Sequence, residues 1–142
     1  MREMLWSLNS TNDNLGNFMQ YVVQYAEGFF KKTEIKVSVR REVDSPETKL
    51  SSEMRRNLFL CAKESLNNIY KHSKANEVYI TFNLNADEVF TMQIVDNGVG
   101  FYNNQNSGYG LQNMQKRMND VGGKYEICNS EKGVCLYFVV KI

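Results

Sequence analysis

Residues 89–101 read Val-Phe-Thr-Met-Gln-Ile-Val-Asp-Asn-Gly-Val-Gly-Phe, an apolar run that ends in an acid and two glycines. The two-residue period of a strand puts Phe90, Met92, Ile94 and Asp96 on one face. Because that face is otherwise apolar, the Asp96 carboxylate is predicted to point toward a core or a pocket. An unpaired buried carboxylate is costly, so Asp96 needs a specific donor, and the glycines allow a ligand close to the backbone. We therefore expect a strand that ends in a ligand site.

The size and composition of the chain exclude several classes of protein. Its 142 residues suffice for one domain with a core, and its formal net charge of +1 does not favour nucleic-acid binding. No apolar run approaches the ~20 residues of a membrane span. We expect a cytoplasmic domain, whose full-length protein could still be membrane-anchored. The three scattered cysteines are expected to be reduced, and no cysteine or histidine cluster has metal-ligand spacing.

Hydrophobic periodicity predicts alternating helices and strands. Helices are expected from a cap at Asp13 or Asn14 to Phe29, from a cap at Ser51 or Ser52 to Ser73, and from Leu111 to a stop at Gly122 and Gly123. Strands are expected at residues 35–40, in a hairpin of residues 78–84 and 89–96, and in a hairpin of residues 125–129 and 134–140. This order predicts an α/β (α+β) two-layer sandwich, with helices packed on one face of a mixed sheet.

The second predicted helix carries a stripe of polar side chains at its C-terminal end. At about 100° per residue, Glu64, Asn68, Lys71 and His72 fall beside the face that is expected to pack on the sheet. An amide oxygen is a hard ligand for Mg²⁺, and a lysine is a point charge for phosphate. The stripe suits a phosphorylated ligand, but solvated ion pairs and a packed histidine explain the same residues.

A third glycine-containing turn, Gly108-Tyr109-Gly110-Leu111, directly precedes the third predicted helix. Such a turn presents backbone N–H groups and a positive helix end to an anion. It follows a polar loop at residues 102–107 rather than a strand, so it is not a dinucleotide-binding fingerprint. Alone, this turn is weak evidence for a ligand site.

Together the three signals resemble a known family. Their order is similar to the ATP-binding (Bergerat) domain of sensor histidine kinases, heat-shock protein 90, DNA gyrase and mismatch-repair ATPases. Residues 64–73 match the kinases' N box, residues 96–101 their first glycine box and residues 108–111 their second. The Lys-His-Ser ending of the N box and the Gly-Leu-x-x-Met-x-x-Arg run at 110–117 are most similar to the nitrate-sensor-type subfamily.

The resemblance implies ATP and Mg²⁺ as cofactors and a role for each matched residue. Asp96 would accept a hydrogen bond from the adenine amino group, and Glu64 would be the catalytic general base. Asn68 would be the metal ligand. The other implied cofactor-binding residues are Lys71, His72, Gly98, Gly100, Gly108, Gly110 and Leu111.

The resemblance also implies what the chain lacks and what it would act on. Residues 1–12 resemble the end of a linker from a missing dimerisation helix, which leaves 13–142 as the catalytic domain. Sensor kinases phosphorylate a histidine on a separate hairpin, and His72 lies inside the N box. The expected partners are that hairpin and, indirectly, a response regulator, with no nucleic acid. We expect this chain to be monomeric and the full protein to be a homodimer.

One departure and three alternatives accompany this interpretation. Val134 follows Gly133 where the family often has a threonine that helps to hold an adenine-bound water. The same fold occurs in stand-alone anti-sigma-type regulators that phosphorylate serine. A nucleotide-binding scaffold without transfer activity is the second alternative. An ATPase of the chaperone or gyrase kind, the third, needs a much longer chain.

Overall fold

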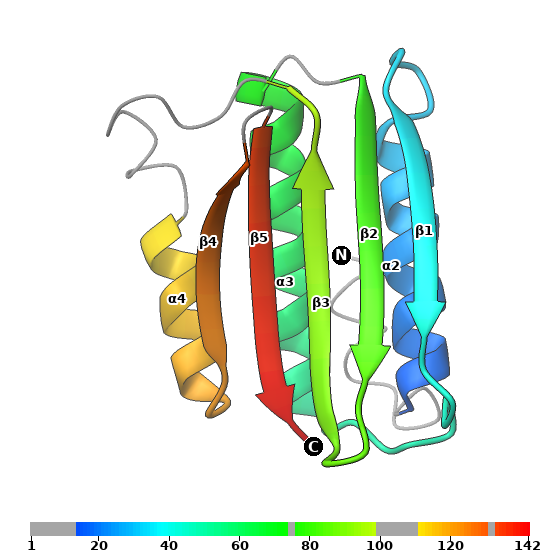
Figure 1. Ribbon diagram of the computed structural model, residues 1–142, viewed down its shortest axis with the longest axis vertical. Coiled ribbons are helices and arrows are strands. Elements are labelled where there is room, and N and C mark those ends of the chain that lie inside the picture. Colours follow the sequence, from blue (N-terminus) through cyan, green and yellow to red (C-terminus); the bar gives the residue numbers. More distant parts are fainter. Residues whose placement is uncertain (1–13, 74–75, 99–110, 131–132) are drawn as a thin grey trace.

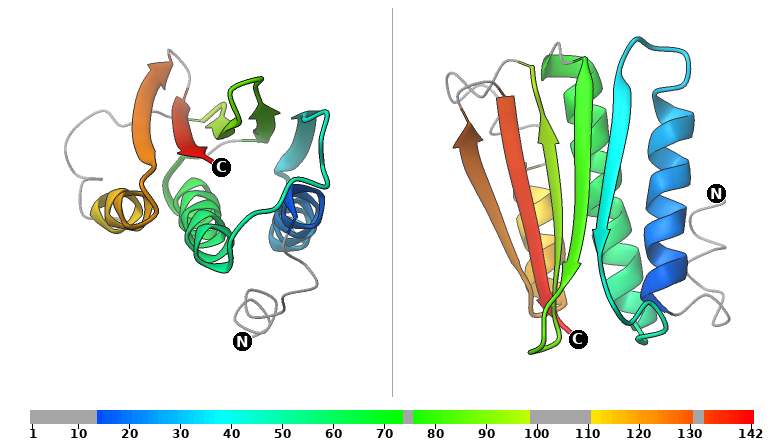
Figure 2. Two further views of the ribbon diagram at one scale, coloured as in Figure 1. Left: turned by 90° about the horizontal axis from the view of Figure 1, so that it is seen from below. Right: turned by 45° about the vertical axis from the view of Figure 1, so that its right-hand side comes forward.

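The computed structural model describes residues 14–73, 76–98, 111–130 and 133–142. Figure 1 shows a mixed sheet with helices behind it, and Figure 2 shows that the helices lie on one face of the sheet. This arrangement confirms the predicted two-layer α/β architecture. The helices are α2 (Leu15–Phe29), α3 (Ser52–Asn68) and α4 (Leu111–Asp120), and the strands are β1 (Lys36–Glu42), β2 (Glu77–Leu84), β3 (Val89–Asp96), β4 (Lys124–Ser130) and β5 (Gly133–Lys141).

The five strands run in the order β1-β2-β3-β5-β4. β1 pairs with β2 in parallel, and every other neighbouring pair is antiparallel. The apolar strand β5 lies between β3 and β4, which agrees with its nearly continuous apolar sequence. β3 is also internal, so its end is held by strands on both sides.

Side-chain caps begin two of the helices where the sequence predicted. The Asn14 side chain accepts a hydrogen bond from the Asn17 N–H at 2.8 Å and begins α2. Of the two candidate serines, Ser51 is the cap of α3, and its hydroxyl accepts from the Met54 N–H at 3.2 Å.

The C-terminal part of the second predicted helix differs from the prediction. The α-helix ends at Asn68, and the chain continues as a π-helix, η2 (Ile69–Ser73). A π-turn uses i→i+5 hydrogen bonds. Because the angular step per residue therefore changes after Asn68, Lys71 and His72 do not continue the α-helical stripe of Glu64 and Asn68.

The core lies between the helices and the inward face of the sheet. Phe82, Phe90, Met92 and Ile94 are buried there, and Phe18 of α2 meets Phe82 and Phe90 edge-on at 6.4 and 6.1 Å between ring centroids. The alternation predicted for β2 and β3 is confirmed, because the inward residues of both strands are buried, apart from the half-buried Leu84 at the end of β2.

The glycine pair after α4 ends that helix as predicted. Gly122 has a φ of +72°, a conformation that favours glycine. A Cβ at Gly123 would stand 2.6 Å from the Val139 carbonyl oxygen, so only glycine lets α4 turn this closely into the sheet.

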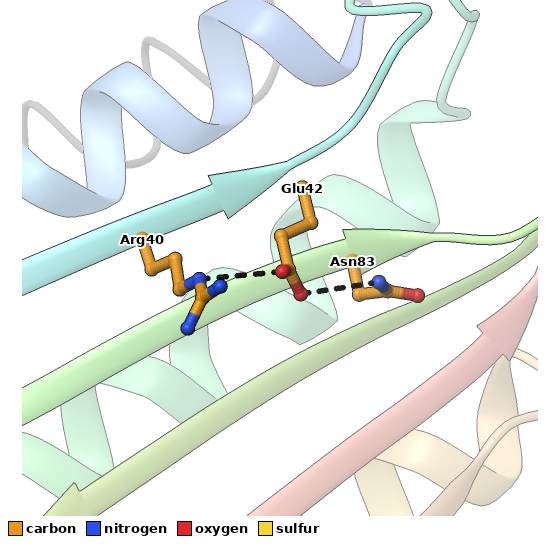
Figure 3. Close-up of polar contacts among 3 residues, drawn as sticks. All are labelled: Arg40, Glu42 and Asn83. Atoms are coloured by element: carbon orange, nitrogen blue, oxygen red, sulfur yellow. Dashed lines mark hydrogen bonds and ion pairs between the residues drawn. The ribbon is translucent and has the colours of Figure 1, made fainter.

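The other sheet face carries polar side chains. Figure 3 shows Arg40 and Glu42 of β1 and Asn83 of β2 joined by polar contacts. The Arg40 Nε lies 3.2 Å from Glu42 Oε2, and Asn83 Nδ2 donates to Glu42 Oε1 at 3.4 Å. Such exposed pairs contribute little to stability, so this face does not explain why the sheet forms.

The prediction that all three cysteines are reduced is wrong. Cys61 is free and buried, whereas Cys135 is disulfide-bonded. The β4–β5 register makes Cys128 the Cα partner of Cys135, and opposite residues of antiparallel strands lie within the Cα spacing that a disulfide needs. Linear spacing does not reveal this strand register, which places the two backbone positions opposite each other. Among the described residues, no helix is both long and apolar enough to cross a membrane.

Candidate functional site

Asp96 is the last residue of β3, and its side chain is 2% exposed. It shares the inward face of the strand with Phe90, Met92 and Ile94, as predicted. The Gly98 N–H donates to Asp96 Oδ1 at 2.9 Å. The other carboxylate oxygen, Oδ2, is buried and accepts no hydrogen bond from any described residue. A buried acceptor of this kind is costly and fits a ligand that brings an N–H donor.

The surroundings of Asp96 disfavour its charged form. Burial raises the pKa of this carboxyl from 3.8 to about 6, although the backbone N–H groups of Gly98 and Val134 lower it. Of these two groups, Gly98 donates to Oδ1, and the Val134 N–H makes no hydrogen bond to Oδ2. Near neutral pH the carboxylate is therefore ionised and able to accept. Val134 contributes its backbone at the position where the family often has a threonine.

Asn97 holds the end of β3 against the start of β2, and the sequence interpretation did not single it out. Its side-chain oxygen accepts from the N–H groups of Asn76 and Glu77 at 3.0 and 2.9 Å. Its own N–H donates to the Glu77 carbonyl at 3.2 Å. Asn97 thus fixes the backbone next to Asp96. An asparagine between the acid and the first glycine is the only sequence signal for this role.

The polar stripe of α3 lies at the same end of the molecule as Asp96. Figure 1 shows the C-terminal end of α3, with η2, beside the end of β3. Glu64 and Asn68 are half-buried and Lys71 is exposed, while the predicted packing face of α3, with Leu58, Cys61, Ser65 and Ile69, is buried. The fold therefore brings Glu64 and Asn68 to the end of the sheet that carries Asp96.

A cavity of about 210 Å³ adjoins this stripe between α3 and α4. Glu64 lines it, and the other lining residues were not predicted as site residues: Leu60, Lys63 and Asn67 of α3, and Asn113, Met114 and Arg117 of α4. Only the contact between two helices distant in sequence creates this cavity. The Gly-Leu-x-x-Met-x-x-Arg run was the available signal for Met114 and Arg117.

Several predicted site residues lie at or beyond the limits of the described structure. Gly100, Gly108 and Gly110, like residues 1–12, lie outside the described residues, as does the side chain of His72. Leu111 is the first residue of α4, as predicted. The glycine-rich part of the predicted phosphate site therefore stays a prediction.

Comparisons with known proteins point to one family. No protein-family model matches the chain. The sensor histidine kinase LiaS of Bacillus subtilis is 29% identical over 133 residues, which cover 92% of this chain and 36% of LiaS. The chain thus spans about a third of this relative. The nitrate-sensor-type subfamily stays a prediction, and the anti-sigma-type alternative is not favoured.

Solved structures show the same fold. The catalytic domain of histidine kinase ThkA is 19% identical, with a TM-score of 0.72 over 90% of this chain and 92% of that domain. The ATP-binding domain of PrrB from Mycobacterium tuberculosis is 20% identical, with a TM-score of 0.67 over 87% of this chain and 90% of that domain. This chain is therefore similar in sequence to a sensor histidine kinase, and it shares the fold of the ThkA catalytic domain and the PrrB ATP-binding domain.

Proposed function

We propose that this chain is the ATP-binding catalytic module of a two-component sensor histidine kinase. It transfers the γ-phosphoryl group of ATP to a histidine on a separate dimerisation hairpin. The buried Oδ2 of Asp96, which has no partner among the described residues, is the single observation that carries this proposal, and the similarity to LiaS supports it. Residues 13–142 form the catalytic domain, and residues 1–12 are the end of a linker.

The end of β3 recognises the adenine ring of ATP. Asp96 Oδ2 accepts a hydrogen bond from the adenine amino group, which satisfies a buried carboxylate oxygen that has no partner among the described residues. Oδ1 stays bound to the Gly98 N–H. Gly98 and Gly100 let the purine ring approach the backbone.

The α3 stripe and the start of α4 hold the phosphates. Asn68 is the Mg²⁺ ligand, because its amide oxygen is a hard donor and its side chain is half-buried at the end of α3. Mg²⁺, when bound, supplies charge neutralisation for the phosphates. Lys71, His72 and the backbone at Gly108, Gly110 and Leu111 bind the phosphate chain.

Glu64 is the catalytic base. It lies one helical turn before Asn68 and lines the cavity between α3 and α4. A half-buried carboxylate at this position is suited to orient the attacking imidazole and to accept its proton. The acceptor hairpin and, through it, a response regulator are the partners. The catalytic module is monomeric and cytoplasmic, and the full protein is a homodimer.

Label transfer from ATP tests this function. The chain is incubated with Mg²⁺ and γ-labelled ATP, with and without a histidine-bearing dimerisation hairpin of a sensor histidine kinase. We expect acid-labile label on the hairpin, as for a phosphoimidazole. Acid-stable label on a serine would instead favour the anti-sigma-type kinase. Failure to bind ATP in a direct binding measurement would overturn every version of the proposal.

A further inference from the structure

The cavity between α3 and α4 combines one acid with two cations. Glu64 and Lys63 enter it from α3, and Arg117 enters it from α4. The proposed function uses Glu64 alone of these three. Asn113 lies one helical turn before Arg117, so both line the same face of α4.

α4 is held on α3 by contacts at the level of the cavity. The Asn57 side chain donates to the Arg117 carbonyl oxygen at 2.8 Å. The Ser65 hydroxyl lies 3.4 Å from the Met114 sulfur, and the Cys61 thiol lies 3.7 Å from the Met114 carbonyl oxygen. Met114 is completely buried. The backbone that carries Arg117 is therefore fixed relative to Glu64, as preorganised catalysis requires.

The charges of Arg117 and Glu64 act on one neighbouring group. Burial raises the pKa of the Cys61 thiol to about 12, Arg117 lowers this pKa and Glu64 raises it. The guanidinium and the carboxylate are thus both within electrostatic reach of the buried Cys61 thiol. Helical side chains lean toward the N-terminus of their helix, and in α4 that end is Leu111, where the proposed function places the phosphates.

We propose that this cavity receives the γ-phosphoryl group and the acceptor imidazole, and that Arg117 is a catalytic residue that contacts the phosphoryl group during transfer. This inference rests on the proposed function. A guanidinium fits two phosphoryl oxygens at once, and an arginine that neutralises the charge of a phosphoryl transition state accelerates transfer greatly in other enzymes.

The step balances with the groups named. The lone pair of a neutral imidazole nitrogen forms a bond to the γ-phosphorus, and the bond from this phosphorus to the β,γ-bridging oxygen breaks. The electron pair of that bond leaves with ADP. Glu64 accepts the proton from the other ring nitrogen. Arg117 exchanges neither protons nor electrons, and its contribution is electrostatic.

Substitution of Arg117 tests the inference. We expect Arg117→Ala to slow phosphoryl transfer to the hairpin roughly 100-fold, as the loss of one preorganised donor does elsewhere. ATP affinity is expected to stay within about twofold, because Arg117 acts mainly in the transition state. Arg117→Lys should recover part of the rate, since it keeps the charge but loses the two-pronged geometry. Lys116→Ala is the matched control, because Lys116 is the adjacent cation of α4 and is exposed.

A binding measurement gives a readout that does not depend on the acceptor. ADP with aluminium fluoride mimics the phosphoryl transition state. Arg117→Ala should weaken the binding of this mimic about as much as it slows transfer, and should leave the binding of ADP alone unchanged. If Arg117→Ala does not fold, as judged by thermal unfolding, Arg117→Gln replaces it and keeps most of the apolar stem.

The outcomes separate this inference from the proposed function. Failure of the unsubstituted chain to transfer label would overturn the proposed function and this inference with it. Normal transfer by Arg117→Ala, or an equal loss of affinity for ADP and for the mimic, would overturn only the role of Arg117.

Discussion

The end of β3 and the cavity between α3 and α4 present opposite environments within one small domain. At the end of β3 one carboxylate is buried among apolar side chains, and one of its oxygens has no donor in the part of the chain that the structure describes. Along α3 and α4 the charged residues Lys63, Glu64 and Arg117 are half-buried. The end of β3 suits selection of an uncharged ring, because a buried acceptor strongly disfavours ligands that lack a matching donor. The cavity between α3 and α4 suits stabilisation of charge that develops during a reaction.

The largest expected effect tests whether the α3 region provides chemistry and not affinity. We expect Glu64→Gln to reduce the rate of phosphoryl transfer by about 10²–10⁴-fold, because an amide cannot accept the imidazole proton. ATP affinity, measured by calorimetry, should change less than about twofold. Glu53→Gln in the exposed first turn of α3 is the control and should leave the rate unchanged. A matching loss of ATP affinity in Glu64→Gln would contradict the division between the two regions.

The next effect concerns affinity and not chemistry. Asp96→Asn keeps an acceptor for the Gly98 N–H but places an NH₂ group at the Oδ2 position, where it faces the adenine amino group. We expect ATP binding to weaken about 10–100-fold, the usual consequence of unpaired buried polar groups. Circular dichroism should show an intact fold. Normal ATP affinity in this variant would contradict the assignment of adenine to Asp96.

The pH dependence of ATP affinity tests whether the Asp96 carboxylate binds the adenine ring in its charged form. Because the pKa of folded Asp96 is about 6, ATP affinity should fall about tenfold from pH 7 to pH 5 as the acceptor is protonated. ATP itself also titrates in this pH range, so Asp96→Asn is the control. The ATP affinity of this variant should lack the part of the fall that comes from protonation of Asp96.

The stability of the unliganded protein should depend on pH in the opposite sense. The folded pKa lies above the unfolded value, so ionised Asp96 destabilises the fold, and this penalty grows from about pH 4 to about pH 6. We expect Asp96→Asn to raise the free energy of unfolding by about 1–3 kcal/mol at pH 7.5 and not at pH 4. Denaturant titrations at both values measure this difference. If the free energies of unfolding of Asp96→Asn and the unsubstituted chain differ by the same amount at both pH values, the Asp96 charge is not the cause of the difference.

The smallest expected effect separates stability from the site. Ser51→Ala removes the cap of α3, which should lower the free energy of unfolding by about 1 kcal/mol in denaturant titrations. Ser51→Asp should restore it, because aspartate caps well and complements the helix dipole. ATP affinity should not change, because Ser51 and Asn68 lie at opposite ends of α3. A change in affinity would show that the helix transmits strain to the phosphate region.

Local patterns predicted much of this fold, and the failures have clear causes. Alternation in β2 and β3 and the caps at Asn14 and Ser51 are local properties of the backbone, so they were predictable. The π-turn after Asn68 was not predictable, because an apolar pattern of α-helical period does not reveal where the angular step per residue changes. The disulfide at Cys135 depends on strand register, and the interaction of Asn97 with Asn76 and Glu77 depends on two segments that meet in space.

By itself, the sequence determined that Asp96 ends an inward-facing strand, because side-chain direction in a strand follows from the two-residue period. It also determined the order of the three motifs that resemble the kinase domain. Only the tertiary structure decided that, among the described residues, one oxygen of Asp96 has a hydrogen-bond donor and the other has none. It alone placed Arg117 beside Glu64. The physical reason is that hydrogen-bond satisfaction and shared cavities depend on distances between segments, whereas strand direction and helix caps depend only on neighbours along the chain.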